Sequence, residues 1–224
     1  MPLPSSRLFA SLAADVARLR AVAARDLTLP VPTCPDWVVD DLVRHVANGL
    51  RNVALRRVRG QDMILRPDPT ETDPLGAVER AYAEFVAELR MRPLDELAEQ
   101  SPENAHAPAE TAYFWLRRMT HEMAVHRADA ELASHESVTT VPPDLAADGI
   151  TEMLEVFLRY ETHAYTEQYA DLLTDWGDDW LLLTAGEGRW RIKVTPAGVD
   201  TAPVECTGAP ATVHGEPTAL LMWL

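Results

Sequence analysis

The sequence predicts a mainly α-helical protein with a smaller α+β part: an N-terminal four-helix bundle followed by a small α+β domain. Up to about residue 133, apolar residues recur at intervals of three and four in long stretches that proline-containing segments separate. Beyond Ser134 the pattern changes to shorter stretches, some of them alternating, with glycine at a turn. The chain has 224 residues, enough for one large domain or two small ones. We place the bundle at residues 1–136 and the second domain at residues 137–224.

The first two helices are predicted from their apolar pattern and their N-terminal residues. The first runs from Ser5 to about Asp26, with Ser5 or Ser6 as its cap. Three prolines between Leu29 and Trp37 require an extended connection. The second helix follows from about Val38 to Arg59, and its early acidic residues suit the positive end of the helix dipole. The inward positions of the first helix are Leu8, Leu12, Val16, Leu19 and Val22.

The third and fourth helices complete the bundle. Asp73 is a good N-cap and Pro74 suits the first turn, so the third helix runs from there to about Arg90. The fourth helix runs from about Glu110 to Ala133. Four helices joined by moderate loops favour a bundle, which holds metal sites between facing helices. The inward positions of the third helix are Leu75, Val78, Tyr82, Phe85, Val86 and Leu89.

The second domain begins with a fifth helix, predicted from Val141 to about Thr162. Segments such as 180–184 and 189–195 are typical of strands, and the turn 186–188 joins them. Residues 217–224 have a helical pattern.

Composition excludes several classes of function. The 20 basic and 35 acidic residues give a net charge of -15, which repels nucleic acid and anionic membrane surfaces. The two cysteines, Cys34 and Cys206, are too few for a disulfide scaffold and suit a reducing compartment. No run of about 18 apolar residues occurs, and we expect a cytoplasmic protein. Cys34 precedes a helix, but no base is at an evident spacing, which favours a structural thiol.

Three polar residues share one face of the predicted fourth helix. At about 100° per residue, Glu122 and His126 are roughly 40° apart, and Asp129 falls within about 20° of Glu122. His121 invites comparison with the zinc-protease motif, but it is five residues from His126 and points about 140° away. The protease interpretation is therefore excluded. What remains is a glutamate and a histidine at metal-ligand spacing, with an acid beside them.

A third ligand must come from another helix, and His45 is the best candidate because its ring is expected to face the bundle interior. Two imidazoles and one carboxylate suit zinc best, and iron, nickel or manganese less well, and three ligands leave a coordination position open. Each residue also has a structural alternative. His45 could be a hydrogen-bonded core residue, Glu122 could pair with Arg44 or Arg118, and Asp129 could be a solvated charge instead of an orienting residue, acid or base.

Two stretches resemble the mycothiol-dependent maleylpyruvate isomerase family, within the DinB-like metal-binding bundles. They are Thr33-Cys34-Pro35-Asp36-Trp37-Val38-Val39-Asp40-Asp41-Leu42-Val43-Arg44-His45-Val46-Ala47 and His121-Glu122-Met123-Ala124-Val125-His126-Arg127-Ala128-Asp129-Ala130-Glu131. The resemblance implies a DinB-like four-helix bundle and a sterol-carrier-protein-like α+β domain. It also implies a divalent metal, first of all Zn²⁺, held by His45, Glu122 and His126, with Asp129 assisting catalysis. Members commonly carry an arginine in a Leu-Trp-Gly-Arg-like end, where this sequence has Met222-Trp223-Leu224, so the chain was trimmed or the substrate anion is held differently.

The function implied by the resemblance is activation of mycothiol, a low-molecular-weight thiol, as cosubstrate. Its thiolate would isomerise a maleylpyruvate-like substrate from cis to trans, or would be transferred to an electrophile as in an S-transferase. The expected partners are thus a small thiol and an electrophile. Two rivals remain: a non-catalytic metal- or ligand-binding paralogue, and a structural protein with an ion-pair core in place of the metal.

Overall fold

The computed structural model describes residues 2–61, 66, 68, 70–97, 108–205 and 208–224, and these divide into two compact units. The first comprises the described residues from 3 to 97 and from 109 to 139, and the second comprises those from 140 onward. The predicted fold class is confirmed, with a helical N-terminal part followed by a small helix-and-sheet part. Within the described residues, no helix is long and apolar enough to cross a membrane.

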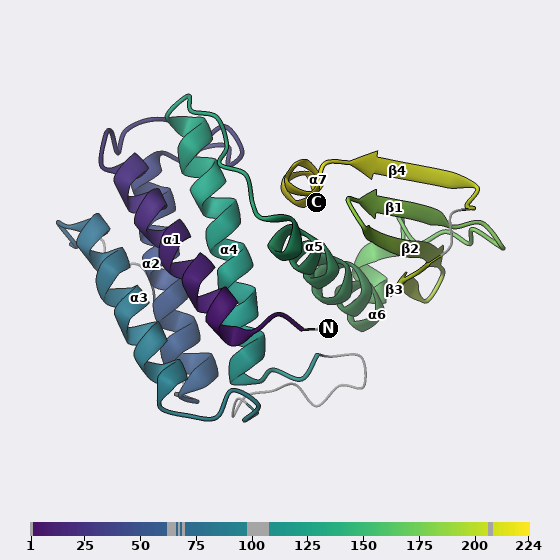
Figure 1. The fold of residues 1–224 in the computed structure, drawn as a ribbon, viewed down its shortest axis with the longest axis horizontal. Coiled ribbons are helices and arrows are strands. Elements are labelled where there is room, and N and C mark those ends of the chain that lie inside the picture. Colours follow the sequence, from purple (N-terminus) through teal and green to yellow (C-terminus); the bar gives the residue numbers. More distant parts are fainter. Residues whose placement is uncertain (1, 62–65, 67, 69, 98–107, 206–207) are drawn as a thin grey trace. The chain divides into compact units, whose positions relative to one another are not determined.

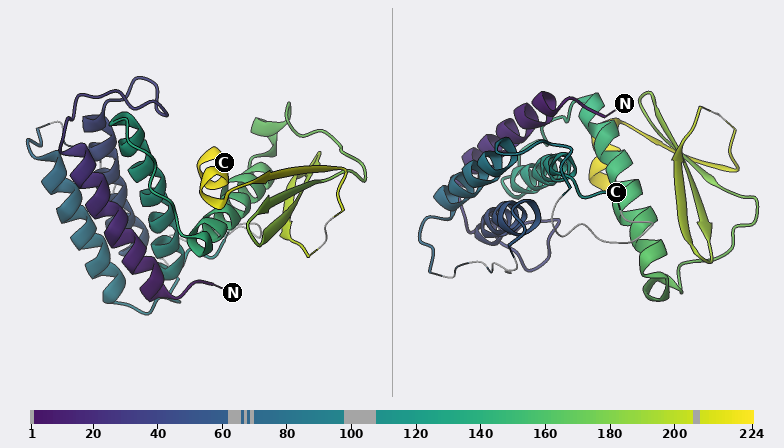
Figure 2. Two further views of the ribbon diagram at one scale, coloured as in Figure 1. Left: turned by 45° about the horizontal axis from the view of Figure 1, so that its top comes forward. Right: turned by 90° about the horizontal axis from the view of Figure 1, so that it is seen from below.

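The first unit is a bundle of four helices that lie side by side (Figures 1 and 2). Helix α1 packs mainly against α4, and α2 packs mainly against α3. The bounds are α1 Ser5–Ala23, α2 Val39–Asn52, α3 Pro74–Arg90 and α4 Ala112–Ala133.

Local chemistry sets where these helices start. The Asp41 carboxylate accepts from the backbone N–H of Val38 at 3.0 Å at the start of α2. Asp73 caps α3 as expected, accepting from the N–H of Gly76 at 2.9 Å. Helix α4 begins two residues later than predicted, because Thr111 is its cap and accepts from Phe114 N–H at 3.0 Å.

The apolar pattern predicted an α-helix that runs to about Arg59, but α2 ends at Asn52. From Val53 to Val58 it becomes a π-helix, η1, and the N–H of Arg59 donates to the carbonyl of Ala54 at 3.0 Å. A π turn holds one extra residue, which the spacing of apolar residues does not reveal.

The expected inward positions of α1 are all buried, whereas two expected inward residues of α3, Leu75 and Tyr82, are partly exposed. Ala81 and Glu88 are buried instead, and Glu88 forms an ion pair with Arg59. A buried carboxylate needs such a partner. The core side chains that are fully enclosed include Leu8, Leu12, Leu19, Leu42, Leu50, Phe85, Leu89, Leu116 and Met123.

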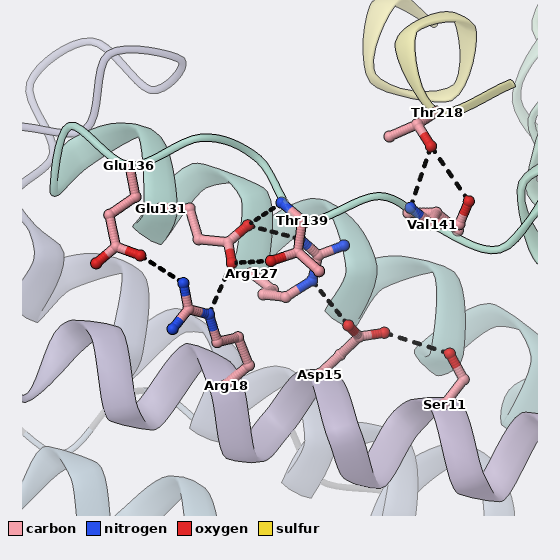
Figure 3. A network of polar contacts seen from close by, with 9 residues as sticks. All are labelled: Ser11, Asp15, Arg18, Arg127, Glu131, Glu136, Thr139, Val141 and Thr218. Carbon is pink, nitrogen blue, oxygen red and sulfur yellow. Dashed lines mark hydrogen bonds and ion pairs between the residues drawn. The ribbon is translucent and has the colours of Figure 1, made fainter. Parts of the chain in front are cut away.

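A network of ion pairs and hydrogen bonds connects α1 with α4 (Figure 3). Arg127 is 2% exposed and donates to Asp15 at 2.7 Å and to Glu131 at 2.6 Å. Glu131, which is fully buried, also accepts from Arg18 and from the backbone and hydroxyl of Thr139. Each buried charge therefore has a partner, and removal of one partner would leave the other charge buried and uncompensated.

The second unit consists of a long helical segment, a four-stranded sheet and a terminal helix. The sheet order is β3-β2-β1-β4, with β1 antiparallel to β2 and parallel to β4. The turn between β1 and β2 contains Gly186 with φ +57°, which favours glycine. The expected single fifth helix contains a π-helical middle portion. The bounds are α5 Pro143–Glu152, η2 Met153–Tyr160, α6 Glu161–Ala164, η3 Thr166–Tyr169, β1 Leu181–Ala185, β2 Gly188–Thr195, β3 Gly198–Pro203, β4 Ala211–Gly215 and α7 Pro217–Trp223.

Candidate functional site

Two histidine rings from different helices meet at one place in the bundle. His45 of α2 and His126 of α4 have ring centroids 5.0 Å apart and lie nearly perpendicular, at 82°. His45 is exposed, so its expected position in the bundle interior is wrong. Its ring instead lies at the surface, between His126 and Trp37, whose centroid is also 5.0 Å away.

The two nitrogens of His126 have different surroundings. Nδ1 lies 3.0 Å from Oδ2 of Asp129, one turn along α4. A carboxylate only accepts, so Nδ1 carries the proton of this hydrogen bond. Nε2 lies 3.3 Å from Oε2 of Glu122 but has no hydrogen-bond partner within the described residues, although the atom is buried.

Glu122 divides its two oxygens between two neighbours. Oε2 faces His126, and Oε1 accepts from the guanidinium of Arg118, one turn earlier in α4. This is one of the two alternative pairings that the sequence allowed. The other, Arg44, pairs with Asp40 at 2.6 Å and donates to backbone carbonyls of the loop before α3.

Asp129 is 6% exposed, so the interpretation as a solvated charge at the helix end is wrong. Its Oδ1 accepts from the hydroxyl of Thr33 at 2.6 Å, and its Oδ2 accepts from His126. Both oxygens are therefore occupied by protein donors. This arrangement suits an orienting residue better than an acid or base in contact with substrate.

The pKa values follow from this geometry. Burial lowers the pKa of His126, but the hydrogen bond to Asp129 and the Glu122 carboxylate outweigh it and raise the pKa to about 9. Burial raises the pKa of Glu122, but His126 and then Arg118 lower it to about 2. Partial shielding of the His45 ring from solvent, by Trp37 and His126, and then the charge of His126 lower the pKa of His45. At neutral pH Glu122 is thus charged and His126 is protonated, so a metal at Nε2 would displace a proton, while His45 is held toward its neutral form, in which an imidazole binds metal.

The side chains of His45, His126 and Glu122 are of the types that bind divalent metals. Two imidazoles and a carboxylate approach from two helices, and the buried Nε2 of His126 is a nitrogen without a partner. As the side chains lie, no group of three or more His, Cys, Asp and Glu residues in the described chain is arranged to hold a metal. In this arrangement one carboxylate oxygen of Glu122 pairs with Arg118 and the other faces His126.

The loop between α1 and α2 supplies two residues that the sequence did not single out, Thr33 and Trp37. The loop is closed by a bridge between Pro30 and Val38 and by a bond from Val31 N–H to the carbonyl of Trp37. Both residues lie in the first stretch that carries the family resemblance, which was the available signal. Burial, and then the charge of Asp129, raise the pKa of the Cys34 thiol, which makes this residue a poor nucleophile. Cys206 lies outside the described residues.

A cavity of about 390 Å³ lies between α2 and α3, on a different face of α2 from His45. Its charged side chains are largely engaged with one another. Arg51 approaches Glu84 at 3.4 Å, and Arg80 pairs with Glu71 at 2.6 Å. None of the four predicted site residues lines this cavity. We therefore place the candidate site where His45 and His126 meet.

Comparison with known proteins identifies one family. The model described as "Mycothiol maleylpyruvate isomerase N-terminal domain" matches residues 9–131, more than half of the chain. The match includes His45, Glu122, His126 and Asp129. No curated protein and no solved structure matches the chain.

Proposed function

The chain belongs to the mycothiol maleylpyruvate isomerase N-terminal domain family, and from this premise we propose that it is a metal-dependent enzyme that activates mycothiol. The family supports an isomerase-like function that involves this thiol, at the level of the family only. The finer proposal is that His45, Glu122 and His126 are the ligands and Asp129 is their orienting residue.

One observation carries the proposal. His126 presents a buried Nε2 without a hydrogen-bond partner among the described residues, beside Glu122 and His45, while Asp129 holds Nδ1. In the metal-free protein Nε2 faces the Glu122 carboxylate, at 3.3 Å, and a divalent cation bound there would take the place of its proton. In most metal sites, the ring nitrogen of a histidine that does not bind the metal donates a hydrogen bond to a carboxylate or a carbonyl, as Nδ1 of His126 does to Asp129.

A divalent cation, first of all zinc, would stabilise the thiolate form of a bound small thiol near neutral pH. The side chains of the protein have separate tasks. Asp129 holds His126 in one orientation, and Trp37 limits the movement of His45. His45 is exposed, so a thiol and its electrophile reach the histidine pair from solvent.

The thiolate can act in two ways. In isomerisation it adds to an activated cis double bond, the adduct rotates about the resulting single bond, and the thiolate leaves to give the trans product. In S-transfer the thiolate forms a C–S bond and either displaces a leaving group, which departs with its bonding electrons, or adds to a double bond that then takes up a proton, and the thioether is the product. We propose isomerisation of a maleylpyruvate-like substrate as the first reaction to test, because the family is named for it.

The direct test is metal analysis of the purified protein beside the His126→Ala variant, followed by assays with and without mycothiol. We expect one divalent metal per parent chain, little in the variant, and loss of maleylpyruvate only when thiol is present. A parent chain without metal argues against the site, and turnover that ignores the thiol argues against the mechanism. Thiol consumption in step with substrate indicates S-transfer.

A specific observation favours a second candidate, a structural protein with an ion-pair core: Glu122 is paired with Arg118. A non-catalytic metal- or ligand-binding paralogue is the third. The metal analysis separates the ion-pair core from the other two, and the assay then separates the paralogue from the enzyme.

A further inference from the structure

The loop residue Thr33 is joined to His126 through Asp129. The Thr33 hydroxyl donates to Oδ1 of Asp129 at 2.6 Å, and the other oxygen, Oδ2, accepts from His126 Nδ1 at 3.0 Å. Thr33 and Asp129 are 96 residues apart in sequence, so this contact fixes the loop onto α4.

Two hydrogen bonds on opposite oxygens fix the plane of a carboxylate. With only the imidazole bond, the Asp129 group could rotate about its own side-chain axis, and the ring of His126 could follow it. The hydroxyl of Thr33 removes that freedom. Asp129 is buried, whereas Thr33 is exposed, so the hydroxyl reaches the carboxylate from the outer side of the site in a part-buried hydrogen bond.

The same loop also contacts the second histidine. Trp37, four residues after Thr33, packs against the ring of His45. The bond between Val31 N–H and the Trp37 carbonyl, at 2.9 Å, closes the loop between these two residues. One short loop therefore touches His45 directly and His126 through a single intervening carboxylate.

We propose that Thr33 is a positioning residue of the site, which acts through Asp129 to hold the imidazole of His126 in the orientation that presents Nε2. This inference rests on the proposed function insofar as Nε2 is a metal ligand. The orientation of the ring, however, is measurable without metal.

The test compares three variants of the full chain. Thr33→Val removes the hydroxyl at nearly constant shape, and Thr33→Ser retains it. Thr28→Val is the matched control, because Thr28 lies in the same connection and its hydroxyl donates to the Asp26 carboxylate at 2.7 Å, outside the site. Thermal unfolding of each variant verifies that it folds.

The first measurement is the dissociation constant for Zn²⁺ by titration calorimetry. We expect Thr33→Val to weaken binding by about 10- to 100-fold, as removal of such an orienting partner typically does. Thr33→Ser and Thr28→Val should remain within about threefold of the parent. Parent-like affinity in Thr33→Val, or equal loss in Thr33→Ser, overturns the proposal.

The second measurement uses metal-free protein with ¹⁵N-labelled histidine. We expect the Nδ1 proton of His126 to exchange with water at least about tenfold faster in Thr33→Val than in the parent or in Thr28→Val. If the parent binds no metal but this difference is observed, the metal proposal fails and the positioning role of Thr33 stands. An unchanged exchange rate rejects that role.

Discussion

Nδ1 of His126 and Oδ2 of Asp129 lie 3.0 Å apart on successive turns of α4. The pair places a charged carboxylate against an imidazole in a largely buried position, since only 13% of the His126 side chain is exposed. The protonation of His126 should therefore depend on Asp129.

Replacement of Asp129 by asparagine should lower the pKa of His126. In the metal-free parent, Asp129 and Glu122 outweigh burial and raise this pKa from 6.5 to about 9. Without the negative charge of Asp129, burial is opposed by Glu122 alone, so we expect the pKa of His126 to fall by at least about one pH unit. NMR titration of the labelled imidazole measures it. Asp200→Asn is the control, since Asp200 pairs with His163 at 3.2 Å in the second unit, and a parent-like titration in Asp129→Asn contradicts the prediction.

Glu131 should make the stability of the bundle sensitive to acid. Burial raises its pKa, but Thr139, Arg18 and Arg127 outweigh burial and lower it to about 2. A lowered carboxyl pKa stabilises the folded state above the unfolded value of about 4.5, and this contribution is lost as the pH falls toward 2. We expect a loss of roughly 3 kcal/mol across that interval.

Urea unfolding of the parent and of Glu131→Gln, from pH 6 to pH 2.5, measures this contribution. The variant should be less stable by about 3–5 kcal/mol at pH 6, because it leaves buried Arg127 with one partner fewer, and its stability should depend less on pH. Glu79→Gln breaks an exposed pair with Arg20 and should cost under about 1 kcal/mol. Burial, and to a smaller extent the charge of Glu131, raise the pKa of Asp15, an opposite effect on acid stability that Glu131→Gln reduces but does not remove. Parallel pH profiles of parent and Glu131→Gln would refute the prediction.

Arg118→Gln should separate the metal site from an ion-pair core. The guanidinium engages an oxygen of Glu122 and repels a cation, so its removal should tighten Zn²⁺ binding by about three- to tenfold if Glu122 is a ligand. Arg44→Gln is the control, because Arg44 pairs with Asp40 instead. Calorimetry measures the affinity. Loss of stability in Arg118→Gln, with no zinc binding in parent or variant, favours the ion-pair core.

Removal of metal should destabilise the parent and leave a ligand variant unaffected. A ligand present at 100 times its dissociation constant adds about 2.7 kcal/mol to the free energy of unfolding. We therefore expect the thermal midpoint of the parent to be higher with zinc than with a chelator, and His45→Ala to lack the difference. His163→Ala, altered in the second unit, should behave as the parent. Equal midpoints for the parent in zinc and chelator would be inconsistent with a resident metal.

Much of the bundle could be predicted because α1 and α3 have regular apolar spacing, and α3 also has a side-chain cap, Asp73. The expected cap of α1 by Ser5 or Ser6 is wrong, because that helix begins at Ser5 without a side-chain cap, and it ends at Ala23 instead of near Asp26. The third helix was predicted to run from Pro74 to Arg90, and it does. The π-helical segment Val53–Val58 could not be predicted, because one extra residue per turn leaves no mark on an apolar stretch. Strands β3 and β4 were not placed individually, since short, partly exposed strands have weak patterns.

The common face of Glu122, His126 and Asp129 followed from helical spacing, and the structure brings His45 beside them. Spacing could not choose between Arg44 and Arg118 as partners of Glu122, because both were within reach of that face. Nor could it find Thr33, whose partner is 96 residues away. Contacts of this kind depend on tertiary structure, which local periodicity does not encode.

The π-helical segment after Asn52 has a consequence for how this bundle can change during evolution. A π turn contains one more residue than an α turn, so a helix can accommodate an added residue there without breaking. The register of His45 is set from the other end of its helix, where Asp41 holds the N–H of Val38. Descendants of this chain can therefore gain or lose a residue in the Val53–Val58 segment and change the far end of the helix, while the histidine keeps its place opposite α4.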